Sequence, residues 1–146
     1  MRELKTVGKW DLRFLEMAKL VASWSKDESS KVGCVITDGK FIVSVGFNGA
    51  PAKVSDTHKT REDKLAVTLH SEVNSILASK RDLNYCTLYC THAPCSNCAA
   101  VICQVGITKV YCIHPSKDFL ARWGASVETT SRLFKEKGID FFSVSL

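Results

Sequence analysis

The chain of 146 residues has little proline, only three residues, and it has no apolar run long enough to cross a bilayer. A membrane-spanning helix needs about 20 consecutive apolar residues, so no membrane partner is expected. Repeats and low-complexity tracts are also lacking in the sequence, which argues against a solenoid or a disordered chain. With 45% hydrophobic residues, residues 1–146 are predicted to form a single domain around one packed core.

Segments of a single charge sign are lacking as well. The formal net charge is +5, yet lysine and arginine are interleaved with acidic residues, and no segment concentrates basic or aromatic side chains. A nucleic-acid surface needs such a track, so no nucleic-acid partner is expected. The pattern fits a solvated surface with a modest positive field, which suits an anionic small substrate such as a nucleotide.

Cysteine, by contrast, is frequent, with seven residues. The odd number and the lack of an apolar signal segment argue against a secreted, disulfide-bonded chain, so a reducing cytoplasm is the expected location. Five of the seven lie in apolar stretches, where free cysteine behaves as a small buried hydrophobe. These five are assigned to the core: Cys34, Cys86, Cys90, Cys103 and Cys112.

Helical and strand patterns alternate along the chain. Apolar residues at helical spacing predict helices, β-rich runs predict strands, and Asp38-Gly39 between two such runs predicts a hairpin. Together these elements predict an α/β fold of three layers, α/β/α, with a five-stranded mixed sheet and a parallel crossover in its second half. The predicted helices are 10–24, 70–79, 95–105 and 127–137, the predicted strands are 32–37, 41–46, 86–91, 109–113 and 139–144, and residues 48–67 are predicted to form a loop placed to cover a pocket.

Two short motifs carry the chemistry. The first is His70-Ser71-Glu72 and the second is Pro94-Cys95-Ser96-Asn97-Cys98, in which Cys95 stands 25 positions after His70. A catalytic zinc takes three protein ligands and leaves a fourth position for water, so His70, Cys95 and Cys98 are the predicted ligands of one zinc per chain. Glu72 is predicted to be the proton carrier and not a ligand.

The spacing agrees with this interpretation, because Cys95 and Cys98 fall on one helical turn. A helix N-terminus stabilises a thiolate through its dipole and its free N–H groups. A Cys-x-x-Cys pair alone also fits a redox pair, half of a structural zinc site or two buried thiols. A structural site would need a fourth ligand, and none of the candidates stands at conventional finger spacing from a second pair: His92, Cys90, Cys103 and Cys112.

The sequence resembles the deoxycytidylate (dCMP) deaminases of the cytidine deaminase-like superfamily from about residue 12 to the C-terminus. The resemblance implies the three-layer cytidine deaminase-like fold and the hydrolysis of dCMP to dUMP and ammonia, with zinc-bound hydroxide attacking C4 and Glu72 shuttling protons. A Gly-aromatic-Asn-Gly-x-Pro turn points to the dCMP branch. Four blocks carry the likeness: Ser25-Lys26-Asp27 leading to Lys31-Val32-Gly33-Cys34, Gly46-Phe47-Asn48-Gly49-Ala50-Pro51, His70-Ser71-Glu72-Val73-Asn74-Ser75-Ile76, and Pro94-Cys95-Ser96-Asn97-Cys98-Ala99.

The resemblance also implies substrate contacts. Asn48 is expected to hydrogen-bond the sugar or base region, and Ser29 and Lys31 are expected near the phosphate. Ser71, which stands where the family usually has alanine, is included among the substrate-binding residues. The structural alternatives are a turn residue for Asn48 and a solvated charge for Lys31.

Other aromatic and imidazole side chains have weaker signals. Phe119 or Trp123 is expected to supply a stacking surface for the base, or to belong to the core or a subunit contact. His92 is expected to line the pocket or orient a neighbour, and His114 to be a loop residue. His58 lies where some family members bind a second zinc, but the supporting cysteines are missing here.

The family further implies a homo-oligomer, a hexamer or smaller, switched on by dCTP and off by dTTP, with Mg²⁺ accompanying the effector. The alternatives that stay open are a dual dCMP/dCTP deaminase and a deaminase of free cytidine-type nucleosides. A deaminase of bases within nucleic acid and a zinc-stabilised interaction module without catalysis are less favoured, because a basic track is missing and Glu72 is present.

Overall fold

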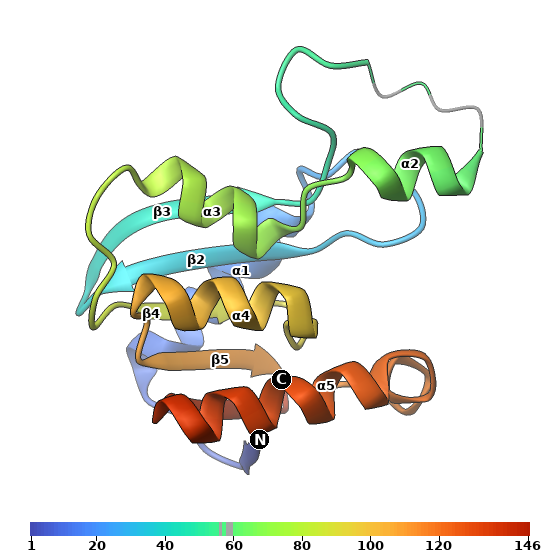
Figure 1. Cartoon of the computed structure of the whole chain (residues 1–146). Coiled ribbons are helices and arrows are strands. Elements are labelled where there is room, and N and C mark those ends of the chain that lie inside the picture. Colours follow the sequence, from blue (N-terminus) through green and yellow to red (C-terminus); the bar gives the residue numbers. More distant parts are fainter. Residues whose placement is uncertain (56, 58–59) are drawn as a thin grey trace.

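A computed structural model describes residues 1–55, 57 and 60–146. One six-stranded mixed sheet runs through the molecule in the order β1-β6-β5-β4-β2-β3 (Figure 1). The strands are β1 (Arg2–Leu4), β2 (Gly33–Asp38), β3 (Phe41–Phe47), β4 (Thr87–Cys90), β5 (Lys109–Ile113) and β6 (Asp140–Val144). The helices are α1 (Lys9–Ala22), α2 (Arg61–Val67), α3 (Ser71–Ser79), α4 (Ser96–Val105) and α5 (Lys117–Lys137).

The sheet combines an antiparallel half with a parallel half. β2 pairs antiparallel with both β3 and β4, whereas β4, β5, β6 and β1 pair parallel to one another. The β2–β3 hairpin turns at Gly39, whose φ of +60° favours glycine. The predicted mixed sheet, hairpin and crossover through α4 are therefore confirmed.

Helices cover both faces of the sheet. α3, α4 and α5 lie on one face and α1 lies on the other (Figure 1). Alternate residues of the strands divide between two apolar clusters, as the two-residue period of a strand requires. Cys34, Leu88 and Val110 belong to the cluster under α4 and α5, while Val35 and Tyr89 pack against α1. The α/β/α layering predicted from the sequence is confirmed.

Two glycines allow helices to approach the sheet closely. A Cβ at Gly33 would lie 2.2 Å from the carbonyl oxygen of Ala18 in α1, and a Cβ at Gly46 would lie 2.4 Å from the backbone nitrogen of Ser75 in α3. Neither distance is sterically tolerable, so glycine is required at both positions. Gly46 in particular sets the depth at which α3 sits on the sheet.

Three elements differ from the sequence prediction. β1 adds a sixth strand, parallel to β6, and its three residues are too few for a two-residue period to be detected. α2 lies inside the stretch predicted as loop and begins at Arg61, with Thr60 as its N-cap accepting the N–H of Asp63. α5 begins at residue 117 and not at residue 127, with Ser116 as its N-cap accepting the N–H of Phe119. In both caps the Ser or Thr hydroxyl accepts the backbone N–H of the third helical residue, as is typical of a helix start.

α5, with 21 residues, is the longest helix, and it is amphipathic. Its charged face includes Lys135 and Lys137 near the C-terminal end, and its buried residues include Val127 and Phe134. Among the residues that the structure describes, no helix is both long enough and apolar enough to cross a membrane.

Candidate functional site

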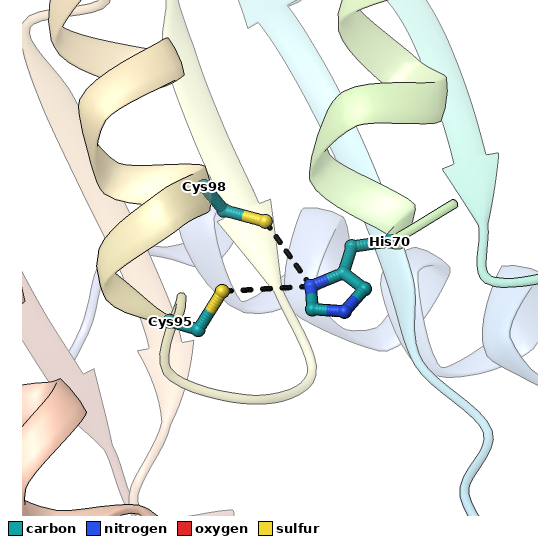
Figure 2. A group of neighbouring side chains, drawn as sticks. All are labelled: His70, Cys95 and Cys98. Atoms are coloured by element: carbon teal, nitrogen blue, oxygen red, sulfur yellow. Dashed lines mark hydrogen bonds between the residues drawn. The ribbon is translucent and has the colours of Figure 1, made fainter. Parts of the chain in front are cut away.

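The N-terminal ends of α3 and α4 bring one imidazole and two thiols together. His70 is the N-cap residue of α3, Cys95 is the N-cap residue of α4, and Cys98 lies in the first turn of α4 (Figure 2). The Nδ1 atom of His70 lies 3.5 Å from the Cys95 Sγ and 3.2 Å from the Cys98 Sγ. The predicted meeting of two helix starts is present, and all three donor atoms lie within 4.8 Å of one another.

These separations fit a tetrahedral zinc ion. With Zn–N of about 2.0–2.1 Å and Zn–S of about 2.3 Å, tetrahedral geometry separates nitrogen from sulfur by about 3.6 Å. One nitrogen and two sulfurs are a donor set typical of catalytic zinc, which keeps a fourth position open. His70 is solvent-exposed, Cys95 is half-buried and Cys98 is buried, so solvent reaches the site from the side of His70 and Cys95.

The pKa values of the two thiols move in opposite directions. Hydrogen bonds from Cys98 and from His70 hold the pKa of the Cys95 thiol far below its ordinary value. The hydrogen bond to Cys95, followed by burial, raises the pKa of the Cys98 thiol. The hydrogen bond to Cys95 also raises the pKa of His70. A metal ion binding here would displace the remaining protons, as zinc binding to thiols and imidazole requires.

Glu72 lies in the first turn of α3 and is 4% exposed. Its Oε1 atom accepts a hydrogen bond from the hydroxyl of Ser71 at 2.6 Å. The Sγ of Cys34, on β2, lies 3.6 Å from the same oxygen. A carboxylate at the first turn of a helix is also favoured by the helix dipole.

A cavity of about 790 Å³ opens over this group, and His70, Glu72 and Cys95 lie in its wall. Its size is within the range of small-molecule sites. The remaining wall comes from the loop before β2, from α2, and from the first two turns of α5. Its polar and charged members include Asp27, Ser29, Ser30, Thr60, Arg61, Lys64, Thr68, Ser116, Asp118 and Arg122.

Asn48 lines the cavity and is 7% exposed. Its side-chain oxygen accepts the N–H of Val32 at 2.9 Å, and its side-chain nitrogen donates to the carbonyl of Ser30 at 2.8 Å. Its backbone carbonyl accepts the hydroxyl of Ser25. Asn48 therefore fastens the loop before β2 to the end of β3, and each end of its amide keeps capacity for one further hydrogen bond.

The other predicted substrate residues are placed differently. Ser29 and Ser71 lie in the cavity wall, although Ser71 is 0% exposed and directs its hydroxyl to Glu72. Lys31 is exposed and is not part of the lining. The structure thus brings Ser29 to the cavity and leaves Lys31 outside its wall.

The sequence interpretation missed two arginines of the wall. Arg61 lies at the start of α2, inside the stretch predicted as loop, and Arg122 lies in the first part of α5, which was assigned no element. The helix-start signals at Thr60 and Ser116 were the available clue. Arg122 and Trp123 follow Phe119 by three and four positions, the spacing that puts helical side chains on one face.

The imidazole and aromatic predictions are resolved in part. His92 lies in the cavity wall, and its ring centroid is 5.6 Å from that of Phe119. Burial lowers the pKa of His92, against the opposing effect of Glu72. Phe119 and Trp123 both line the cavity. His114 contacts Ser143 at 3.0 Å, away from the cavity lining.

His58 lies outside the described residues, so the prediction made for it is not tested by the structure.

The five cysteines assigned to the core divide into two groups. Cys103 is half-buried. The other four are buried, namely Cys34, Cys86, Cys90 and Cys112. All seven cysteines of the chain have free thiols.

Supporting contacts come from α5, which packs beside α4. The hydroxyl of Thr130 donates to the carbonyl of Pro94 at 2.8 Å, and the N–H of Ser96 donates to the Ser126 hydroxyl at 2.9 Å. These bonds hold the segment that carries Cys95. They join residues 30 to 36 positions apart, so they cannot be predicted from a local sequence pattern.

Comparison with known proteins agrees with this geometry. The family model described as the cytidine and deoxycytidylate deaminase zinc-binding region matches residues 8–114. A protein of Aliivibrio fischeri described as an uncharacterized deaminase is 52% identical over 136 residues, covering 92% of both chains. The deoxycytidylate deaminase of Mus musculus is 35% identical over 144 residues, covering 90% of this chain and 78% of that protein.

Solved structures share the fold. The dCMP deaminase of cyanophage S-TIM5, crystallised with dCMP and dUMP, superposes with a TM-score of 0.76. The match covers 93% of this chain and 97% of the phage chain at 21% sequence identity. At that identity the likeness concerns the fold alone.

Proposed function

Since the chain belongs to the zinc-binding family of cytidine and deoxycytidylate deaminases, we propose that its residues 1–146 act as one domain that hydrolyses dCMP to dUMP and ammonia. The observation that carries the proposal is the convergence of His70, Cys95, Cys98 and Glu72 at one cavity of nucleotide size. The named deoxycytidylate deaminases among the relatives favour the monophosphate. The product would supply dUMP for thymidylate synthesis.

His70, Cys95 and Cys98 would hold the zinc ion. When bound there, zinc supplies a Lewis acid that makes water nucleophilic at neutral pH. Glu72 would accept the proton of the attacking water and deliver protons to the ring nitrogen and to the departing amino group. Its burial beside the metal ligands supports this role, because a desolvated carboxylate exchanges protons with a neighbour rather than with bulk water.

The wall of the cavity suits the remaining parts of a nucleotide. Phe119 and Trp123 offer aromatic surface for the cytosine ring, and Asn48 keeps hydrogen-bonding capacity toward the sugar or base. We assign the phosphate to Arg61 and Arg122, with Ser29, because a guanidinium binds phosphate through two parallel hydrogen bonds.

Further parts of the proposal rest on the family alone. We expect a homo-oligomer that responds to dCTP as activator and dTTP as inhibitor, with Mg²⁺ accompanying the effector. A cytoplasmic location agrees with seven free thiols, since cysteines persist in the reduced form in that compartment.

The test is a product assay on the purified, zinc-loaded protein. Cytidine, dCMP, dCTP and a cytosine-containing oligonucleotide are offered in parallel, with and without Mg²⁺ and an effector nucleotide, and ammonia and uracil products are measured. Turnover of dCMP well above that of cytidine supports the proposal. Turnover of dCTP at a similar rate would indicate a dual enzyme, and activity on cytidine or the oligonucleotide alone would contradict it.

A further inference from the structure

A chain of buried polar groups runs from the sheet to the Glu72 carboxylate. The Cys90 Sγ, on β4, lies 2.7 Å from the Cys34 Sγ, on β2, and these residues are direct partners across the two strands. The Cys34 Sγ lies 3.1 Å from the Ser71 Oγ, which donates to Oε1 of Glu72 at 2.6 Å. Cys34, Ser71 and Cys90 are each 0% exposed, so water does not compete for these contacts.

One arrangement of the protons satisfies every member of this chain, although the Cys34 Sγ also lies 3.6 Å from Oε1 of Glu72 and can donate there instead. Ser71 has a single hydroxyl proton, and it is given to Glu72, so the Ser71 oxygen is free to accept the S–H of Cys34. The Cys34 sulfur in turn accepts the S–H of Cys90. Burial raises the pKa of both thiols, which keeps them protonated and able to donate. Hydrogen bonds linked in one direction strengthen one another.

A second metal site is the competing interpretation, because donor atoms of Cys34, Glu72 and Cys90 lie within 4.8 Å of one another. Two sulfurs on a tetrahedral zinc ion would be separated by about 3.8 Å, as follows from Zn–S of about 2.3 Å. The Cys34 and Cys90 Sγ atoms lie 2.7 Å apart, and the zinc content of the wild-type chain, one ion or two, distinguishes the two interpretations.

We propose that Ser71, supported by the Cys34 and Cys90 thiols, is a positioning residue that fixes the Glu72 carboxylate for proton transfer. The inference rests on the proposed function, in which Glu72 carries the protons. It replaces the expected substrate contact of Ser71, because the hydroxyl is committed to Oε1 and the residue is fully buried. Holding Oε1 stops rotation of the carboxylate and so orients its second oxygen.

The first test compares Ser71→Ala with Ser75→Ala. Ser75 is a matched control, since it is also 0% exposed in α3 but donates to the backbone carbonyl of Glu72 at 2.8 Å. Ser71→Ala is expected to lower kcat for dCMP about tenfold or more, in line with loss of a hydrogen bond to a charged group. KM should stay within about twofold and zinc content should stay at the wild-type level, with Ser75→Ala close to wild type.

The second test is a double-mutant cycle with Cys34→Ala, with Cys112→Ala as the control for an equally buried thiol outside the chain of contacts. Cys34→Ala should lower kcat, whereas Cys112→Ala should not. Because Cys34 contacts both Ser71 and Glu72, the two single losses are coupled, and the loss in the double variant should be smaller than their product.

Some outcomes would overturn the proposal. A rise in KM at constant kcat for Ser71→Ala would make Ser71 a substrate contact, and two zinc ions per wild-type chain would make the Cys34–Cys90 pair a metal site. A spectroscopic readout separates these failures from failure of the proposed function. The infrared difference between wild type and Glu72→Gln isolates the Glu72 carboxylate stretch, and Ser71→Ala should shift that band whatever the substrate. An unmoved band would refute the inference, and an inert wild type would refute only the proposed function.

Discussion

The Lys64 ammonium lies 2.9 Å from Oδ1 of Asp27, and this ion pair joins α2 to the loop that precedes β2. The same carboxylate oxygen accepts the N–H groups of Ser29 and Ser30 at 2.8 and 3.0 Å. α2 has no buried residues of its own. Polar contacts rather than apolar packing therefore hold this helix against the cavity.

Removal of the Lys64 charge is predicted to weaken substrate binding more than folding. Lys64→Met should raise KM for dCMP a few-fold, because α2 would lose its attachment to the loop of Ser29. The free energy of unfolding should change by less than about 1 kcal/mol, the usual range for partly exposed ion pairs. Steady-state kinetics and urea unfolding check this, with Lys19→Met on α1 as a control. An unchanged KM would show that the pair does not shape the site.

Asp27 predicts a pH dependence of stability. Burial raises the pKa of its carboxyl, but the hydrogen bonds from Lys64, Ser30 and Ser29 together bring it below the ordinary value of 3.8. A group whose pKa is lower in the folded state stabilises the protein above its unfolded-state pKa, and this stabilisation is lost as the pH falls through the folded-state value. Urea unfolding below about pH 4 should show Asp27→Asn losing less stability on acidification than wild type. Parallel curves would contradict the prediction.

Replacement of Glu72, the proposed proton carrier, is predicted to separate metal binding from catalysis. Glu72→Gln keeps the shape and removes the ionisable group, so kcat should fall by about 10² to 10⁴, the usual contribution of general acid–base catalysis. Zinc content by atomic absorption should match that of wild type, because Glu72 is not among the predicted ligands. A variant with nearly full activity would exclude Glu72 as the proton carrier.

The metal ligands are predicted to behave as a set. Cys95→Ser and Cys98→Ser should each lower zinc content and activity together, since hydroxyl oxygen is a poor replacement for thiolate on zinc. Cys103→Ser offers a control on the same helix, because Cys103 lies in α4 but outside the ligand group. Retention of the metal in either ligand variant, measured after dialysis against a chelator, would refute the assignment.

The two arginines of the wall are predicted to recognise the phosphate. Arg61→Ala and Arg122→Ala should each raise KM for dCMP by about tenfold or more, since a charge-assisted bidentate contact is worth roughly 1.5–3 kcal/mol. Turnover of cytidine, which has no phosphate, should change little. Lys31→Ala serves as the comparison, because Lys31 is exposed outside the cavity lining. A larger effect at Lys31 would restore the original phosphate assignment.

Gly46 is predicted to be required by packing. In Gly46→Ala, the new Cβ would meet the backbone of α3 at 2.4 Å, so the helix that carries Glu72 must shift. Overpacking of this kind costs about 1–3 kcal/mol, and kcat should fall with it. Gly124→Ala is the control, because a Cβ there meets nothing within 4 Å in α5. Thermal unfolding with a kinetic assay checks both, and equal stability of the two variants would count against the close approach.

The sequence by itself determined what depends on short spacings. Pro94, Cys95 and Cys98 lie within one helical start, His70 and Glu72 lie within another, and the Asp38-Gly39 turn closes a hairpin. Each of these follows from local backbone geometry, in which neighbours three or four positions apart share a helix face. The ligand set, the layer order and the parallel crossover could therefore be predicted before any contact was known.

Only the tertiary structure decided what depends on distant pairing. β1 joins β6 through a register of Arg2 with Phe142. The wall of the cavity includes residues of α2, which was predicted as loop, and of the beginning of α5, which was assigned no element. The contact of Ser71 with Cys34 joins residues 37 positions apart. Such contacts depend on how helices pack on the sheet and on how the long segments between them bring distant residues together. A short segment of the sequence determines neither of these. The spacing of the motifs thus indicated the metal site, whereas the packing of the sheet positions the carboxylate beside it.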